Sequence, residues 1–188
     1  MNLLKLDQYK IKLIFFTFLF SLLFRFCLYY FQIFDTWGLT GDSQEYIDIA
    51  KSIRDYSVIG LNGEPGMNRT PGYPILIFFS FIFSENIGSI IFVQFFVDSI
   101  TAIMIIDIAN KTELPSKYKY ILSILLVSCL YTAIYSGMVM TETLYSFLII
   151  TSFWLIYGNN DKRKFLFDLS YFKITTLSFV YASIILVR

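Results

Sequence analysis

Long apolar runs recur along this chain, and they constrain its fold more than any other feature of the sequence. The runs lie at residues 11–34, 87–109, 120–136, 138–157 and from residue 165 to the C-terminus. A helix needs about 17–25 apolar residues to cross the hydrocarbon core of a bilayer. Helices are favoured because a segment in lipid must satisfy its own backbone hydrogen bonds. We therefore expect an all-α, polytopic membrane protein with about five transmembrane helices.

The composition agrees with this class and excludes others. Of the 188 residues, 56% are hydrophobic and 15% are charged, whereas about a quarter of a soluble domain is charged. The net charge of +1 indicates neither nucleic acid nor acidic ligands as partners. Histidine, the commonest metal ligand and a frequent general base, is absent. Cys27 and Cys129 lie in apolar runs, where we expect packed thiols rather than a disulfide.

Clusters of basic residues orient the predicted helices. The clusters are Lys5, Lys10 and Lys12, then Lys111, Lys117 and Lys119, and finally Lys162, Arg163 and Lys164. Loops rich in lysine and arginine stay on the cytoplasmic side. We therefore expect a multi-pass protein of the cell (inner) membrane with a cytoplasmic N-terminus. The first run is too long for a signal-peptide core and reads as an uncleaved helix. Residues 41–74 and 137–142 then lie outside.

A shorter apolar run at residues 75–84 tests this orientation. With Pro74 it spans roughly 16 Å as a helix, which is about half of a bilayer core. If it crossed the membrane, the later basic clusters would lie outside. We therefore expect an interfacial or re-entrant half-helix on the outer side, within an outer loop at residues 35–86.

The same outer loop contains a predicted amphipathic helix at residues 42–55. Its apolar face is formed by Tyr46, Ile49, Ala50 and Ile53, and its polar face by Gln44, Asp48, Lys51 and Asp55. Such a helix lies on a membrane surface with its apolar side down.

Two candidate residues for chemistry lie in this loop. Asp42, with Glu45 three residues later, fits a capping box, which is the simpler interpretation. The alternative is that the Asp42 carboxylate acts as a general base or binds a metal. Arg69 is most simply a solvated cation. The alternative is a phosphate clamp, since guanidinium binds phosphate in bidentate fashion and Pro71 and Pro74 stiffen the following backbone.

Further polar residues lie in or beside the apolar runs. Glu142 is either a first-turn acid that the helix dipole stabilises or part of the wall of an outer cavity. Gln94 and Asp98 share a helix face, which predicts an interhelical hydrogen bond. Arg25 must face other helices or headgroups. The sequence has no nucleotide-binding glycine loop, zinc motif or nucleophile elbow.

Three of these elements, taken in order, resemble the N-terminal part of GT-C membrane glycosyltransferases. They are Asp42 with Tyr46 and Ala50, the Arg-Thr-Pro-Gly-Tyr-Pro element at 69–74, and Thr141-Glu142. The clan of aminoarabinose transferases and protein O-mannosyltransferases is the most similar. The resemblance covers essentially the whole chain but under half of a family member. Ser43 stands where many members have a second acid.

The resemblance implies a partial GT-C fold and sugar transfer from a polyprenyl-phosphate donor to an acceptor outside the cytoplasm. Residues 1–188 would be the N-terminal part of the transmembrane domain. By resemblance, Asp42 is the catalytic carboxylate, and Arg69 and Tyr73 bind the donor phosphate. The residues that would line the cavity are Glu142, Tyr46 and Glu45. No cofactor is certain, and a divalent metal stays possible.

The resemblance also implies that the chain is a truncated piece that is inactive alone, so whether it is an enzyme stays open. The run that follows Lys173 is short of a full bilayer core, which agrees with truncation. The alternative is a non-enzymatic membrane protein, such as a transporter fragment or an assembly subunit, in which Asp42 only caps a helix.

Overall fold

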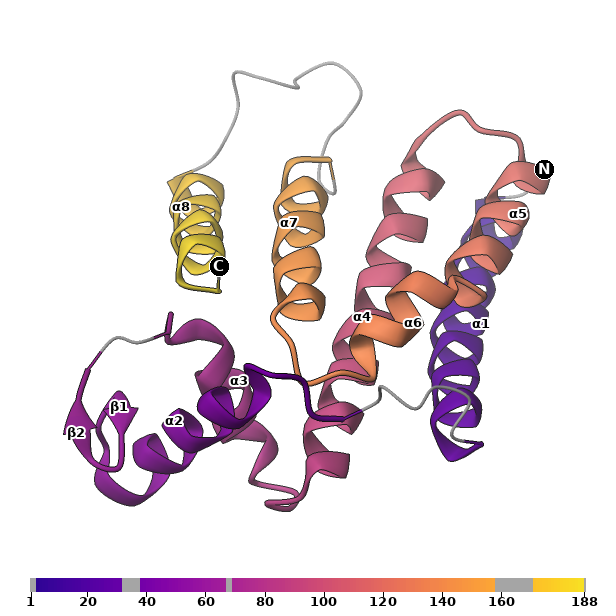
Figure 1. Ribbon diagram of the computed structural model, residues 1–188. Helices are drawn as coiled ribbons and strands as arrows, with labels where there is room; N and C mark the ends of the chain where they lie inside the picture. The colour runs from indigo at the N-terminus through magenta and orange to yellow at the C-terminus, as the bar shows by residue number, and fades with distance from the viewer. Residues whose placement is uncertain (1–2, 32–37, 67–68, 158–170, 188) are drawn as a thin grey trace.

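The computed structural model describes residues 3–31, 38–66, 69–157 and 171–187 (Figure 1). This part of the chain is helical apart from one two-stranded hairpin, so the predicted all-α class is confirmed. The basic cluster at 162–164 and the predicted start of the last span at residue 165 lie outside the described residues.

Three stretches are long and apolar enough to cross a membrane. They lie in α1 (Leu3–Tyr30), in α4 (Ile87–Lys111) and in the pair α5 (Ser116–Val127) and α6 (Leu130–Ser136). Their mean hydropathies are 2.1, 2.1 and 1.5. These candidate spans indicate a multi-pass protein associated with a lipid bilayer. The remaining apolar helices, α7 (Glu142–Tyr157) and α8 (Tyr171–Val187), are shorter.

Helix α4 lies at the centre of the long helices. It packs against α1 on one side and α7 on the other, and α8 lies beyond α7 (Figure 1). In the most apolar part of α4, 61% of the residues are buried, against 28% in α1 and 17% in α5–α6. The outer helices therefore leave most of their apolar surface free for lipid.

The predicted run at 120–136 is not one continuous helix. It breaks between α5 and α6, at Ser128 and Cys129. The Ser128 hydroxyl donates to the carbonyl oxygen of Ile124 at 2.8 Å, a contact that bends helices. The break turns α6 toward the centre of the bundle, where it packs against α4 and α7.

A compact outer layer lies at one end of the long helices. It consists of α2 (Ser43–Tyr56), the hairpin of β1 (Gly60–Leu61) and β2 (Glu64–Pro65), and α3 (Gly72–Ser80) (Figure 1). The apolar face predicted for α2 is correct, because Tyr46, Ile49 and Ala50 are buried. That face packs against α3.

Helix α3 is the predicted half-helix. It has nine residues, which is roughly 13 Å and too short to cross a bilayer. It begins at Gly72 rather than near residue 75, because Pro71 occupies the cap position, and proline suits the start of a helix.

Two contacts place the remaining loops at the two ends of the bundle. At one end, the Tyr9 hydroxyl donates to the Ser116 carbonyl oxygen at 3.4 Å, so the starts of α1 and α5 lie together. At the other end, Gly38 exchanges backbone hydrogen bonds with residues 137 and 139, at 3.0 and 2.9 Å. The first two basic clusters therefore share one end, and the outer loop meets the 137–142 turn at the opposite end.

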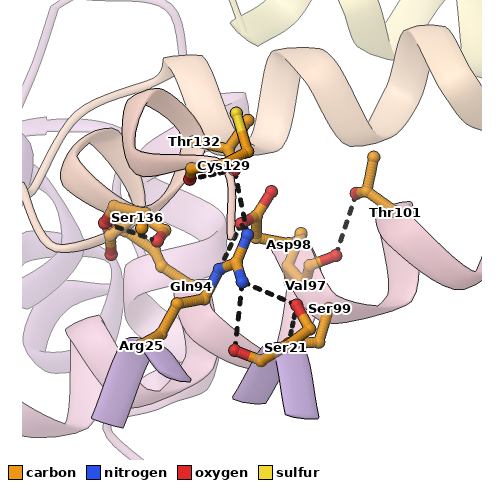
Figure 2. Close-up of polar contacts among 11 residues, drawn as sticks. Ser21, Arg25, Gln94, Val97, Asp98, Ser99, Thr101, Cys129, Thr132 and Ser136 are labelled. Atoms are coloured by element: carbon orange, nitrogen blue, oxygen red, sulfur yellow. Dashed lines mark hydrogen bonds and ion pairs between the residues drawn. The ribbon is translucent and has the colours of Figure 1, made fainter. Parts of the chain in front are cut away.

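A buried polar network joins the long helices (Figure 2). Arg25 of α1 is only 1% exposed and forms an ion pair with Asp98 of α4. Its guanidinium also donates to the Ser21 hydroxyl at 2.6 Å and to the Thr132 hydroxyl at 2.9 Å. The prediction that Arg25 faces other helices is confirmed.

Gln94 lies one turn before Asp98 and joins α4 to the outer layer. Its side-chain amide donates to the backbone oxygens of Ser136 at 3.1 Å and Met138 at 2.6 Å, and its oxygen accepts from Tyr73. The predicted hydrogen bonds between helices are thus present.

Replacing Arg25 with leucine should lower the free energy of unfolding by about 3–5 kcal/mol, because Asp98 is left buried without its partner. The double variant Arg25→Leu/Asp98→Leu should recover most of this loss, because both charges are removed. Reversible unfolding in mixed micelles, followed by circular dichroism, measures both values. Lys12→Leu, which changes an exposed cation of the same helix, is the control. Equal losses in the single and double variants would contradict this account.

Candidate functional site

Asp42, Glu45 and Arg69 meet in the outer layer. Arg69 Nη2 lies 2.6 Å from Asp42 Oδ1, and Arg69 Nε lies 2.8 Å from Glu45 Oε2. Asp42 stands at the N-cap position of α2 and Glu45 in its first turn, whereas Arg69 comes from the segment that enters α3. Two carboxylates therefore hold one guanidinium at a partly exposed position. The Arg69 side chain is 35% exposed and the Asp42 side chain 56%.

The capping-box interpretation of Asp42 and Glu45 is wrong. Asp42 stands at the N-cap position of α2 but has helical backbone angles, and its side chain makes no capping hydrogen bond. Glu45 also turns to Arg69 instead of reaching back to the cap. The physical reason is that charge-assisted hydrogen bonds to a guanidinium are stronger than a bond to a neutral backbone N–H.

Tyr46 lies directly under this ion-pair cluster. The guanidinium carbon of Arg69 is 5.7 Å from the centroid of the Tyr46 ring, a cation–π distance. The side chain is 8% exposed. Burial raises the pKa of the Tyr46 phenol, although the positive charge of Arg69 works against this. The phenol is therefore neutral at physiological pH and keeps its proton for hydrogen bonding.

Tyr73 supports Tyr46 from below. The two rings meet edge to face with centroids 5.1 Å apart, and Tyr73 is fully buried, with its hydroxyl donating to Gln94. Burial raises the pKa of the Tyr73 phenol well above its usual value. Its predicted role in phosphate binding stays a prediction. In the structure its hydroxyl is bonded to the central helix, away from Arg69.

Glu142 is the first residue of α7. Its charge acts on both Tyr46 and Tyr73, which places it close to them. One carboxylate oxygen, Oε2, is buried and has no hydrogen-bond partner among the described residues. Glu142 and Asp98 border a small cavity of about 30 Å³. The structure thus brings Asp42, Glu45 and Arg69 into contact, with Glu142 near the same tyrosines.

Ser43 is a structural residue of this site to which the sequence analysis assigned no role. Its hydroxyl accepts from the Thr40 backbone N–H at 2.6 Å and donates to the Val139 carbonyl oxygen at 2.9 Å. It therefore ties the start of α2 to the turn before α7. The sequence signal was a small hydroxyl residue at the position where the resemblance suggests an acid.

An apolar groove lies between α3, α7 and α8. It has a volume of about 340 Å³ and is lined mainly by apolar side chains of α3, α7 and α8, with Ile75, Leu148 and Phe179 among them. Gly72, three residues after Arg69, makes this arrangement possible. A Cβ at this position would lie 2.7 Å from the Leu186 backbone oxygen, so any larger residue would push α8 away.

In the described part of the chain, no three acidic or cysteine side chains come together as a metal-binding set. Asp42 and Glu45 are both engaged by Arg69 instead. A divalent metal at this position would have to compete with a guanidinium already in place.

A matched pair of variants separates the two interpretations of Asp42. Asp42→Ala should change the free energy of unfolding by less than about 0.5 kcal/mol, because no cap is lost, whereas loss of a real cap costs about 1 kcal/mol. Ser43→Ala should cost roughly 1–2 kcal/mol, because a buried carbonyl and a backbone N–H lose their partner. Thermal unfolding of both variants in detergent provides the comparison. The reverse order of effects would restore the capping interpretation.

Comparisons with known proteins add no family to this geometry. Searches against protein-family models, curated proteins and solved structures found no match to this chain. The candidate site is therefore defined by its own residues: an arginine held by two carboxylates and stacked over Tyr46, which in turn packs against the buried Tyr73.

Proposed function

We propose that this chain carries the donor-binding part of a membrane glycosyltransferase site. The site would transfer a sugar from a polyprenyl-phosphate donor to an acceptor hydroxyl on the non-cytoplasmic side. One observation carries the proposal: Arg69 is partly exposed, and it lies three residues before Gly72, which lines an apolar groove of about 340 Å³. A lipid-linked phosphate has a charged head and a hydrocarbon tail, and these two features match the guanidinium and the groove.

The proposal includes a five-span topology. α7 has 16 residues, or roughly 24 Å, and a modest local thinning of the bilayer accommodates such lengths. With α7 and α8 counted as spans, the basic ends of α1 and α5 face the cytoplasm and the N-terminus is inside. Asp42, Arg69 and Glu142 then face the opposite side. This arrangement would correspond to the expected N-terminal part of a GT-C transmembrane domain, with its outer loop at 35–86.

The ion pairs of Arg69 suggest how the chemistry would begin. The donor phosphate competes with Asp42 and Glu45 for the guanidinium. When it succeeds, the Asp42 carboxylate is released and can accept the proton of the acceptor hydroxyl. The acceptor oxygen then bonds to the anomeric carbon as the bond from that carbon to the phosphate oxygen breaks. The polyprenyl phosphate leaves with the electron pair, and Arg69 stabilises its growing negative charge.

The other residues of the site would position these groups. The Tyr46 ring would hold the Arg69 guanidinium by a cation–π contact, and Tyr73 would support Tyr46 through an edge-to-face contact. Glu142 would form part of the cavity wall nearest the acceptor. The acceptor and the sugar are left unspecified.

The second candidate function is a non-enzymatic membrane protein, such as a transporter fragment or assembly subunit. The break between α5 and α6 near Asp98 favours it, since transporters use interrupted helices around their binding sites. Asp98 and Gln94 are both occupied by protein partners, however. If the transporter account is correct, vesicle flux should depend on Asp98, and phosphate-lipid binding should not depend on Arg69.

Arg69→Ala should weaken binding of a polyprenyl phosphate by about tenfold or more, because a charge-assisted hydrogen bond to phosphate is lost. Asp42→Asn should instead strengthen binding several-fold, because Arg69 loses a competing carboxylate. In any preparation that transfers sugar, Asp42→Asn should also abolish turnover. Native mass spectrometry of the chain in micelles with added polyprenyl phosphate measures the affinities.

Arg54→Ala is the matched control, because Arg54 is a partly exposed arginine of the same outer layer that pairs with Asp55 and Glu85. It should bind the lipid as the parent chain does. Equal weakening by Arg54→Ala and Arg69→Ala would show a general effect of charge and would contradict a specific phosphate site.

A further inference from the structure

Gln94 of α4 is completely buried, and the two ends of its side-chain amide hold two separate parts of the chain. The amide oxygen accepts a hydrogen bond from the Tyr73 hydroxyl of α3. The amide nitrogen donates to the backbone oxygens of Ser136 at 3.1 Å and Met138 at 2.6 Å, at the end of α6 and in the turn that follows it. A side-chain amide has two N–H donors, so both are used. Turning the amide over would break all three hydrogen bonds, so its orientation is fixed.

The oxygen end of this amide leads to the Arg69 guanidinium. Tyr73 lies four residues after Arg69, in the first turn of α3. The Tyr73 ring packs edge to face against the Tyr46 ring, with centroids 5.1 Å apart. The guanidinium carbon of Arg69 lies 5.7 Å from the centroid of that same Tyr46 ring. Gln94 therefore holds both the helix that follows Arg69 and, through Tyr73, the ring against which the guanidinium packs.

The nitrogen end leads to the carboxylates that pair with this guanidinium. Met138 is followed by Val139, whose carbonyl oxygen accepts from the Ser43 hydroxyl at 2.9 Å. Ser43 is completely buried and is the first residue of α2. It directly follows Asp42, whose carboxylate lies 2.6 Å from Arg69 Nη2. The start of α2 is therefore tied to the same amide that holds α3.

The two paths close into a ring of contacts at the ion pair between Arg69 and Asp42. This ion pair is the exposed part of the ring, since the Arg69 side chain is 35% exposed and the Asp42 side chain 56%. Gln94, Tyr73 and Ser43 are all completely buried. A phosphate can therefore open the ion pair while the buried contacts keep both partners in place. Groups that are held in position before binding lose less entropy when the ligand arrives.

We propose that Gln94 is a positioning residue that sets the separation between the Arg69 guanidinium and the carboxylates of α2, and thereby preorganises the phosphate site. It acts through other side chains and does not touch the donor. The effect on phosphate affinity rests on the function proposed above, whereas the effect on Arg69 is measured without any donor. Immobilising a long side chain on binding costs free energy that corresponds to an affinity loss of about two- to tenfold.

Gln94→Leu in the full chain tests the proposal, first in the absence of lipid. Nuclear magnetic resonance of the chain in micelles follows the Arg69 Nε–H signal, which is identified by its absence from Arg69→Lys. In the parent chain this hydrogen should exchange slowly with water, because Nε donates to Glu45 at 2.8 Å. Gln94→Leu should make the exchange several-fold faster, because the local structure opens more often. The Arg54 Nε–H, which donates to Asp55 at 2.7 Å, should keep its rate and is the internal reference.

Native mass spectrometry with added polyprenyl phosphate then measures the affinity, which Gln94→Leu should weaken by about two- to tenfold. Thr17→Val is the matched control, because it removes a buried 2.7 Å hydrogen bond to Ser123 that joins α1 to α5. It should lower the melting temperature and leave both the Arg69 exchange rate and the affinity unchanged. The double variant Gln94→Leu/Tyr73→Phe should regain part of the melting temperature, because no buried phenol lacks a partner. Its affinity should stay low, because the link from α4 to α3 is still missing.

The positioning role is overturned if Gln94→Leu leaves the Arg69 exchange rate unchanged, or if Thr17→Val changes that rate as much. It is also overturned if the double variant regains affinity together with melting temperature, since a purely structural role would give that result. A parent chain whose binding of polyprenyl phosphate does not depend on Arg69 would instead contradict the proposed function. The exchange rates would then still decide whether Gln94 positions Arg69.

Discussion

The buried ion pair between Arg25 and Asp98 is the interaction on which the arrangement of the helices depends. Apolar helix faces in lipid have no strong preference for one another, since lipid tails are as apolar as leucine. Polar side chains decide which faces meet, because an unpaired charge in the bilayer is costly. Arg25 thereby fixes α1 against α4 and, through Thr132, against α6. The break at Ser128 is what allows α6 to present that threonine.

The position of the candidate site follows from the same central helix. Gln94, one turn from Asp98, holds the Tyr73 hydroxyl; Tyr73 supports Tyr46, and Tyr46 carries the guanidinium of Arg69. This column of contacts runs from the centre of the bundle to its outer surface. A change at Gln94 would therefore reach Arg69 through two aromatic rings, without touching any residue proposed to act on a substrate.

The sequence predicted features that depend on residues close together in the chain. Apolar length predicted the three candidate spans in α1, α4 and α5–α6 but also two further spans, whose helices α7 and α8 are shorter, and helical periodicity predicted most of the buried face of α2. Contacts between distant residues were not predictable in this way. Asp42 has the sequence of a cap, but it contacts Arg69, which is 27 residues away. The pairing of Arg25 with Asp98, 73 residues apart, likewise depends on helix packing.

The charge balance of Arg69 bears on what it could bind. Arg69 is already paired with Asp42 and Glu45, so an incoming phosphate would have to displace carboxylates. Under the proposed function, binding of the phosphate and release of the Asp42 carboxylate would therefore occur together. Such an arrangement would suit a reactant that binds and leaves rather than a lipid that stays bound.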